Sequence, residues 1–272
     1  MVTKLIHDAA RLLTNSDTPL LDARVLMAEA ANTENAALLF GDITPEQEQL
    51  FEKFIQMRRS GMPVAYILGK KEFMGFTFKV NENTLIPRPD TECLVERVLE
   101  KHFTAPKILD LCTGSGCIGI SLALMIENST ALLADLSDGA LQIAEENIHL
   151  HHLENRVSTL KTDVLTDDLN GFYDIIVSNP PYIPTSTVPT LDVSFSEPKM
   201  ALDGGSDGLD FYRIIIINAA SHLNEGGMLA LEIGYDQGEA VTALCREYFE
   251  EVNLFKDYGG NDRVVTATHR FR

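Results

Sequence analysis

The sequence predicts a doubly wound α/β fold with a mostly parallel sheet, preceded by a small helical domain. After residue 107, apolar strand-like segments alternate with helical stretches, which is typical of sheets built from strand–helix–strand units. A glycine-rich turn follows the first of these strands directly and opens a helix, as in ligand-binding folds of this class. The strand-like segments are KILDL, ALLAD, VSTLKTD, YDIIVS, GMLALEIG and RVVTATH.

The composition fits a soluble globular protein. The chain has 272 residues, of which 45% are hydrophobic and 23% are charged, and both fractions are ordinary. Its apolar runs are all shorter than the roughly 18 residues that a membrane span requires. The first residues, MVTKLIHDAARLL, are too polar for a signal peptide. We therefore expect a cytoplasmic protein.

The net charge of −18 argues against binding to an extended nucleic acid backbone. Nearly all of the excess acid lies after residue 80, where it suits a basic protein partner or simple solubility. Four cysteines without a CxxC pair are typical of reduced, buried thiols. His149, His151 and His152 lie near an expected helix end without the acids or cysteines that would complete a ligand set, so we expect no metal site.

The N-terminal elements read as short helices. Thr18-Pro19 is expected to open one helix, and Thr44-Pro45-Glu46-Gln47 has the form of a capping box that opens another, which should end near Gly61. These helices lack a catalytic constellation. We assign residues 1–62 to a helical substrate-docking domain, residues 63–85 to a β-hairpin linker because PVAYILGKKEFMGFTFKV partly alternates, and residues 86–272 to a catalytic domain.

The turn after KILDL has the residues of a nucleotide-binding loop. Gly114, Gly116 and Gly119 satisfy GxGxxG, and glycines let a backbone turn sharply and approach a ligand closely. Asp135 ends the next strand, where its carboxylate can accept ribose hydroxyl protons. NAD and S-adenosylmethionine both fit this pattern because both carry an adenosine.

Two further acids favour S-adenosylmethionine. Asp110 ends the first strand, where a carboxylate would crowd a pyrophosphate but suits a ligand with an ammonium and a sulfonium group. Asp163 ends the following strand, where it can bind an adenine amino group. The three acids follow successive strands, at the edge where open α/β sheets bind ligands. This combination predicts a bound S-adenosyl ligand.

The next strand leads into Asn179-Pro180-Pro181-Tyr182 at the same edge. Both prolines fix φ and lack N–H donors, and Pro180 biases Asn179 towards an extended backbone. In so stiff a turn the Asn179 side chain and the Pro180 carbonyl can accept the two hydrogens of one planar NH2 group, while Tyr182 lies flat against it. Such a nitrogen is a poor nucleophile, so its orientation towards a methyl sulfonium would supply the catalysis without a strong base.

Several motifs together resemble the protein-glutamine N5-methyltransferases of the HemK/PrmC type. They are IPRPDTE (86–92), DLCTGSG (110–116), YDIIVSNPPYIP (173–184), EPKMALDGGSDGL (197–209) and GGNDRVVTATH (259–269). The resemblance covers nearly the whole chain and implies a Rossmann-like class I methyltransferase domain with a mostly parallel seven-stranded sheet. It also implies methyl transfer from S-adenosyl-L-methionine, leaving S-adenosyl-L-homocysteine, to the glutamine of the GGQ motif in peptide chain release factors, a modification that supports translation termination.

The same resemblance implies roles for individual residues. The cofactor is expected at Asp110, Cys112, Thr113, Gly114, Ser115, Gly116, Asp135, Asp163, Val164 and Asn179. The substrate amide is expected at Asn179, Pro180, Pro181 and Tyr182, of which Asn179, Pro180 and Tyr182 would be catalytic. Arg88 and either Phe73 or Phe76 are expected to line the cleft. Cys112 departs from the family, which commonly has glycine there, and this leaves the local backbone geometry in question.

Other functions stay open from the residues alone. A ribosomal protein glutamine is a sibling substrate. A nucleic-acid adenine-N6 methyltransferase is a further alternative, because the same tetrapeptide can hold an adenine amino group; the acidic charge and the flanking motifs argue against it. A non-enzymatic adenosyl sensor or protein-binding module would not need an intact NPPY. We expect a monomer that binds a release factor and makes no direct contact with nucleic acid.

Overall fold

The computed structural model describes residues 2–33 and 42–270. The chain divides into two compact units, Met1–Lys70 and Lys71–Arg272. The division falls inside the segment 63–85 that the sequence assigns to a linker. Within the described residues, no helix is both long and apolar enough to cross a membrane.

The first unit is a helical domain. It contains α1 (Val2–Ala10), α2 (Pro19–Ala31), α3 (Pro45–Arg59) and the short α4 (Val64–Leu68). The expected capping box opens α3, because Gln47 N donates to Thr44 Oγ1 while Thr44 N donates to Gln47 Oε1. An ion pair of 2.7 Å between Arg58 and Asp22 joins α3 to α2. The helix starts predicted at Thr18-Pro19 and at the Thr44 capping box are therefore confirmed.

The expected hairpin is shorter than the segment 63–80 on which it was predicted. Val64–Leu68 is one helical turn, and its Ile67 packs into the helical core of the first unit. Only β1 (Lys70–Phe73) and β2 (Phe76–Lys79) pair, joined by Met74 and Gly75, which both have positive φ. Two positive φ values suit the right-handed twist of a tight hairpin. The prediction is wrong for residues 64–68 because VAYIL is a continuous apolar run, which does not distinguish a strand from a helical turn.

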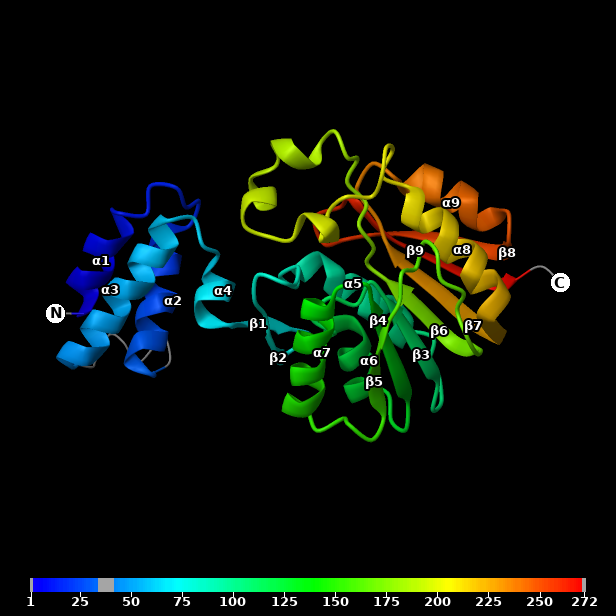
Figure 1. Cartoon of the computed structure of the whole chain (residues 1–272), viewed down its shortest axis with the longest axis horizontal. Coiled ribbons are helices and arrows are strands. Elements are labelled where there is room, and N and C mark those ends of the chain that lie inside the picture. The colour runs from blue at the N-terminus through cyan, green and yellow to red at the C-terminus, as the bar shows by residue number, and fades with distance from the viewer. Residues whose placement is uncertain (1, 34–41, 271–272) are drawn as a thin grey trace. The chain divides into compact units, whose positions relative to one another are not determined.

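The second unit contains the predicted sheet. Its strand order is β5-β4-β3-β6-β7-β9-β8, and only β9 runs antiparallel to its neighbours. The doubly wound, mostly parallel seven-stranded fold is thus confirmed (Figure 1). The strands are β3 (Lys107–Leu111), β4 (Thr130–Asp135), β5 (Val157–Lys161), β6 (Tyr173–Ser178), β7 (Leu223–Glu232), β8 (Phe249–Lys256) and β9 (Asp262–Arg270). The strand-like segments predicted from the sequence correspond to all of them except β8.

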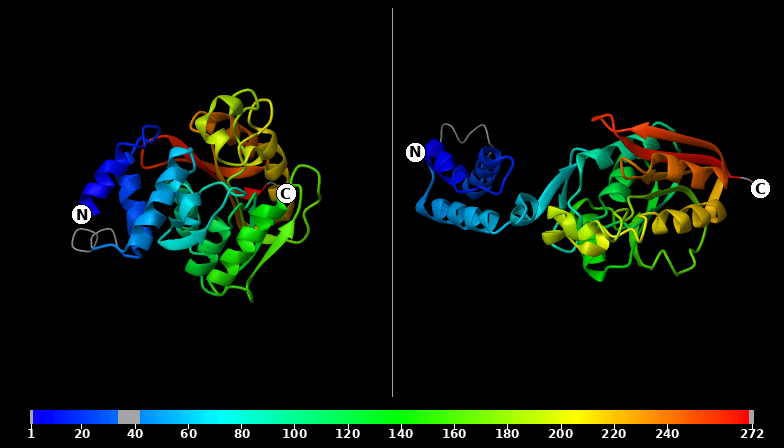
Figure 2. Two further views of the ribbon diagram at one scale, coloured as in Figure 1. Left: turned by 60° about the vertical axis from the view of Figure 1, so that its left-hand side comes forward. Right: turned by 90° about the horizontal axis from the view of Figure 1, so that it is seen from above.

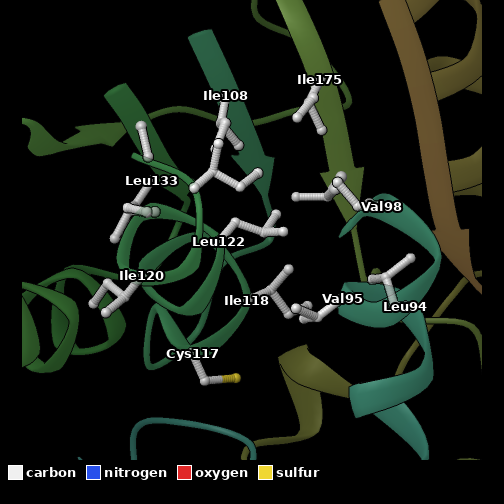
Figure 3. Packing of buried hydrophobic residues seen from close by; sticks show 14 of the residues in the cluster. Leu94, Val95, Val98, Ile108, Cys117, Ile118, Ile120, Leu122, Leu133 and Ile175 are labelled. Carbon is white, nitrogen blue, oxygen red and sulfur yellow. The ribbon is translucent and has the colours of Figure 1, made fainter. Parts of the chain in front are cut away.

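Helices cover both faces of this sheet. On one face lie α5 (Pro89–Leu99), α6 (Cys117–Met125) and α7 (Asp138–Leu150), whose apolar residues share a core with Ile108, Leu133 and Ile175 (Figure 3). On the other face lie α8 (Asp210–His222) and α9 (Gly238–Arg246), which pack against Leu109, Ile176 and other residues of alternate strand positions. This alternation fixes which strand side chains face α5.

A long excursion connects β6 to α8. It includes three short 3-10 turns at Val188–Thr190, Asp192–Phe195 and Lys199–Ala201. Figures 1 and 2 show this yellow-green segment outside the layers of helices and sheet. Its return passes the end of β6, where Ile183 forms a bridge with Asp203. The excursion therefore borders the carboxyl edge of the parallel strands.

Candidate active site at the carboxyl edge of the sheet

A cleft of about 190 Å³ opens at the carboxyl ends of β3, β4, β5 and β6. Residues 83–88 and 198–201 contribute further walls. The structure brings ten of the expected site residues to this cleft, namely Arg88, Cys112, Thr113, Gly114, Ser115, Asp135, Asp163, Val164, Asn179 and Pro181. All of them except Arg88, which precedes α5, come from four strand ends that are far apart in sequence, so the parallel topology is what assembles them.

The glycine turn after β3 is built on left-handed backbone conformations. Gly114 has φ +57°, and a Cβ there would meet no protein atom within 4 Å, so the space beside it is open to a ligand. Gly116 has φ +80°, and a Cβ there would press on Ile120 and Leu133. Gly116 is therefore needed for packing beneath the turn, and it does not line the cleft. Asn147 of α7 supports the turn by donating to the Ser115 carbonyl at 2.8 Å.

Cys112 occupies a backbone conformation that usually favours glycine, and its side chain packs into the core. Its φ is 58°, in the left-handed region that favours glycine. The thiol is half-buried and packs against the core on the α8 side of the sheet. Burial, with nearby Asp135 a smaller cause, raises the pKa of Cys112 well above the ordinary thiol value. The residue is thus a neutral, mildly strained part of the cleft wall.

Asp135 is held rigidly at the end of β4. Its Oδ2 accepts from Gly114 N at 2.9 Å and its Oδ1 accepts from Ser137 N at 2.9 Å. Burial raises the pKa of Asp135, and these backbone donors partly oppose that shift. Each oxygen keeps a lone pair for a further donor. A fixed acceptor of this kind suits a ribose diol.

Asp110 lies beneath the glycine turn and does not line the cleft. Its side chain is fully buried, and its Oδ2 accepts from Thr113 Oγ1 at 2.6 Å and from Gly119 N at 3.0 Å. Strand alternation turns it towards α6, on the same face as Ile108, and away from the cleft. Burial raises the pKa of Asp110 to about 7. Its Oδ1 has no hydrogen-bond partner among residues 2–33 and 42–270.

The NPPY turn leaves β6 at the same edge. Ser178 Oγ donates to the Leu111 carbonyl at 2.6 Å and ties the end of β6 to β3. The half-buried Asn179 then enters the cleft wall, and its Nδ2 donates to Thr91 Oγ1 at 3.4 Å. Pro180 is buried and Tyr182 half-buried, and neither side chain lines the cleft. Burial raises the pKa of Tyr182 to about 12, so its phenol is neutral.

The DGGSDG segment, residues 203–208, packs directly against the backbone of the NPPY turn. A Cβ on Gly204 would lie 2.7 Å from the Pro181 carbonyl oxygen, and one on Gly208 would overlap the Tyr182 carbonyl oxygen. Gly204 N also donates to the Ile183 carbonyl at 2.8 Å. Only glycine lets the two backbones approach this closely. The segment therefore braces the turn that presents Asn179.

Gln237 is a buried residue that sequence reasoning missed. Its Nε2 donates to the Tyr182 carbonyl at 3.0 Å and to the Gly208 carbonyl at 3.2 Å. Its Oε1 accepts from Gly234 N at 3.0 Å. Gln237 thus clamps the NPPY turn, the DGGSDG segment and the turn after β7 together. A buried glutamine shortly after a strand end is a weak sequence signal, because such residues are common in surface loops.

Glu232 is the second missed residue, and it ends β7 beside Asn179. It is 2% exposed, and its Oε2 lacks a hydrogen-bond partner in the described parts of the chain. Burial raises the pKa of Glu232 to about 7, while hydrogen bonding to Thr91, the Arg263 charge and hydrogen bonding to Asn179 oppose the shift. The signal available in the sequence is an acid that ends the apolar strand GMLALE.

Two expectations for the cleft rim have different outcomes. Arg88 lines the cleft and forms an ion pair with Glu197, whose other oxygen accepts from Ile86 N at 3.0 Å. This pair ties the excursion after β6 to the segment before α5. The expectation for Phe73 is wrong: it is 1% exposed and packs edge-to-face on Phe78 in the core. Strand alternation in a short hairpin does not indicate which aromatic side chain faces inward, and the alternative, Phe76, contacts His151.

The chemistry of the cleft fits S-adenosylmethionine. Gly114 leaves open space beside its backbone, Asp135 offers fixed acceptors, and Val164 and Leu165 offer an apolar wall next to Asp163. An amide side chain, Asn179, borders the same space. The residues present therefore match both an adenosyl ligand and a planar amide.

Comparisons with known proteins give one family over most of the chain. The family "Methyltransferase small domain" matches residues 89–260, and "PrmC N-terminal domain" matches residues 4–69. The release factor glutamine methyltransferase of Clostridium botulinum is 42% identical over 257 residues, which cover 91% of each chain. The protein of the same name from Moorella thermoacetica is 41% identical over 262 residues, which cover 93% of each chain.

Solved structures support the fold. The hMettl16 catalytic domain superposes with a TM-score of 0.59 at 16% identity, covering 75% of this chain and 81% of that chain. The ribosomal protein L11 methylase of Lactobacillus delbrueckii subsp. bulgaricus superposes with a TM-score of 0.51 at 22% identity, covering 67% of this chain and 80% of that chain. At such low identity these likenesses establish the methyltransferase fold and nothing about the substrate.

Proposed function

Because this chain belongs to the release factor glutamine methyltransferase family, we propose that it methylates the side-chain amide nitrogen, N5, of the glutamine in the GGQ motif of peptide chain release factors. The chain is an S-adenosylmethionine-dependent methyltransferase. The structural observation that carries the proposal is a single cleft bordered both by the glycine turn and by Asn179. That arrangement places a cofactor cradle next to a side chain suited to a primary amide.

The cofactor is assigned to the strand ends. The backbone of Thr113 to Gly116 would hold its methionine part, Asp135 the ribose hydroxyls, and the Asp163-Val164 turn the adenine. Asp110 acts from below, because its bonds to Thr113 and Gly119 fix the shape of the turn. When bound, the cofactor supplies an electrophilic methyl group. The carboxylates Asp135 and Asp163 give the cleft the negative charge that a cationic ligand requires.

The substrate glutamine is assigned to the NPPY turn. Asn179 Oδ1 and the Pro180 carbonyl would accept the two hydrogens of its NH2 group. The expected packing of Tyr182 on the amide plane does not fit this geometry, because its side chain does not line the cleft; its backbone would instead hold the turn in place through Gln237. An amide nitrogen has a delocalised lone pair, so holding both N–H bonds fixes its direction of attack. In the net reaction a nitrogen–carbon bond forms, a sulfur–carbon bond breaks, and one amide proton passes to solvent. Orientation and preorganised acceptors are the source of the rate enhancement.

A labelling experiment tests this function. The protein is incubated with methyl-labelled S-adenosylmethionine and, separately, a release factor, the same factor with its GGQ glutamine replaced by asparagine, a ribosomal protein mixture and duplex DNA. Label on the first factor alone is the expected result. Label on DNA would assign an adenine-N6 methyltransferase, and label on a ribosomal protein would assign the sibling substrate; either result without label on the factor overturns the proposal.

The helical unit is proposed to dock the protein substrate. Its family match, residues 4–69, ends one residue before the first unit ends, at Lys70. The described residues that line the cleft all lie in the second unit, so the cofactor is assigned to that unit and the docking of the protein substrate to the first. A variant lacking residues 1–69 should keep its affinity for the cofactor and show a higher KM for the factor. An unchanged KM would contradict the docking role.

The setting of the reaction is proposed from the same family. A release factor is a cytoplasmic partner, and the net charge of −18 suits recognition of a basic protein surface more than of a phosphate backbone. We propose that the protein acts as a monomer in the cytoplasm and does not contact nucleic acid directly. Equilibrium sedimentation and a titration with duplex DNA at low salt test the two statements separately.

A further inference from the structure

Asn179 and Glu232 follow equivalent positions of two neighbouring parallel strands. Ser178 of β6 pairs in register with Leu231 of β7, so the next residue of each chain, Asn179 and Glu232, lie side by side. Alternation also places both on one face of the sheet: Val177 and Ala230 face the α5 core, whereas Ile176 and Leu231 face the α8 core. Both side chains therefore point towards α5.

Thr91 of α5 completes this group. It is 2% exposed, and its Oγ1 accepts from Asn179 Nδ2 at 3.4 Å. Interactions with Thr91 and with Asn179 favour the ionised form of Glu232, so both side chains lie next to its carboxyl. Asn179 and Thr91 line the cleft, whereas Glu232 is almost fully enclosed behind them. Glu232 is thus placed to act on Asn179 and out of reach of a ligand.

From this geometry we infer that Glu232 is a positioning residue that fixes the orientation of the Asn179 amide, an inference that rests on the proposed function of Asn179. An asparagine amide can rotate by half a turn and exchange its oxygen with its NH2 group. A carboxylate can only accept hydrogen bonds, so Glu232 stabilises the orientation in which Nδ2 faces it. Oδ1 is then left for the hydrogens of the substrate amide. In the reversed orientation two oxygens would face each other, which is unfavourable in a buried site.

Charged groups on the surrounding elements set the protonation of Glu232. Arg263 of β9 favours its ionised form, and Asp90 of α5 disfavours it. Tyr182, after β6, is neutral and also senses this carboxyl. Burial raises the pKa of Glu232 to about 7. Protonation would give Glu232 an O–H donor and remove its selectivity for Nδ2, so the orientation of Asn179 becomes dependent on pH around neutrality.

The test compares Glu232→Gln with Asp174→Asn. Glutamine has nearly the same shape but offers both a donor and an acceptor, so it does not select one orientation of Asn179. Asp174 is a matched control, because it also joins strands and accepts from an asparagine amide, Asn224 Nδ2 at 2.8 Å, but at the opposite end of β6. We expect Glu232→Gln to lower kcat by about tenfold, with KM and the cofactor Kd within about threefold, and Asp174→Asn to retain wild-type kcat.

A double-mutant cycle separates positioning from general structural damage. If Glu232 acts through Asn179, Glu232→Gln should have little further effect on the residual rate of Asn179→Ala. A full, additive loss in that background would overturn the inference. So would a wild-type kcat for Glu232→Gln in an enzyme that is otherwise folded.

A spectroscopic measurement decides the matter even if the proposed substrate is wrong. The side-chain N–H resonances of Asn179 are followed by NMR as the pH is raised from about 5 to about 9 in the cofactor-free protein. We expect a shift with a midpoint near 7 in the wild type and in Asp174→Asn, and none in Glu232→Gln. A flat wild-type profile, or the same profile in Glu232→Gln, would contradict the role of Glu232. Absence of label on any release factor would instead count against the proposed function alone.

Discussion

Gly208 lies directly against the backbone of Tyr182, so closely that a Cβ at position 208 would overlap the Tyr182 carbonyl oxygen. The same carbonyl accepts from Gln237 Nε2 at 3.0 Å. Two segments far from NPPY in sequence thus determine where its tyrosine backbone lies. The rigidity of the turn comes from this bracing as well as from its two prolines.

Gly208→Ala should displace the NPPY turn. Gly208 has φ +76°, and Gly226 is a matched control with φ +75° and no atom within 4 Å of an added Cβ. Gly226→Ala should cost about 1 kcal/mol of unfolding free energy from backbone strain alone. Gly208→Ala should cost about 2–4 kcal/mol, because overpacking adds to the strain, and should lower kcat by at least about tenfold. Urea unfolding measures the free energy of unfolding, and the methyl-transfer assay measures kcat. Equal values of both for the two variants would show that the contact between Gly208 and Tyr182 is unimportant.

Cys112→Gly should be almost neutral. Cys112 has φ 58°, so glycine relieves about 1 kcal/mol of backbone strain, while the extra freedom of the unfolded chain removes about 0.5–1 kcal/mol. The variant should keep cofactor affinity and kcat, and its unfolding free energy should change by less than about 1 kcal/mol. Cys112→Val, with a β-branched side chain in the same conformation, should be destabilised by about 2 kcal/mol. A large loss in the glycine variant would mean that the thiol has a role beyond packing.

Local sequence signals located the parts of the site that lie next to glycines and prolines. Gly114, Asp135 and Asn179 follow strands, and the rule that parallel strand ends share one edge is enough to bring them together. Their roles towards ligands stay proposals. Glu232, Gln237, Thr91 and Glu197 could not be found in this way, because each meets its partner through strand register, through the packing of α5 on the sheet or through the long excursion after β6.

The failures have equally specific causes. β8 was not identified because only its first residue, Phe249, is fully buried, and an exposed edge strand lacks the apolar pattern of the others. The place of Asp110 at a strand end predicts a ligand contact, but its strand position faces the α6 core, and its Oδ2 accepts hydrogen bonds from Thr113 and Gly119. A position at the end of a strand predicts at which edge of the sheet a residue lies. The alternation of side chains along the strand then decides whether its side chain faces the cleft or the core.

Asp110 should make stability depend on pH. Its folded pKa is about 7, against an ordinary value of 3.8, so the folded state binds its proton more tightly than the unfolded state. Its stabilising contribution is complete below pH 3.8 and is lost as pH rises through 7. The unfolding free energy should fall by up to about 1.4 kcal/mol per pH unit across this window. In Asp110→Asn, urea unfolding from about pH 4.5 to 7.5 should give a smaller slope; an unchanged slope would mean that Asp110 is already ionised in the folded protein.

Asn179→Ala should separate cofactor binding from methyl transfer. The cofactor cradle is assigned to the glycine turn, Asp135 and the Asp163-Val164 turn, whereas Asn179 borders the cleft from β6. Calorimetric titration with S-adenosyl-L-homocysteine should therefore give a Kd within about threefold of the wild type. The transfer rate to the release factor should fall by about 100-fold or more, as for the loss of one preorganised group at a reacting centre. Asn253→Ala, an exposed asparagine on the edge strand β8, controls for the substitution itself and should leave both quantities unchanged. A collapse of cofactor affinity in Asn179→Ala would assign this side chain to the cofactor, and the assignment of the glutamine amide would then have to rest on the Pro180 carbonyl.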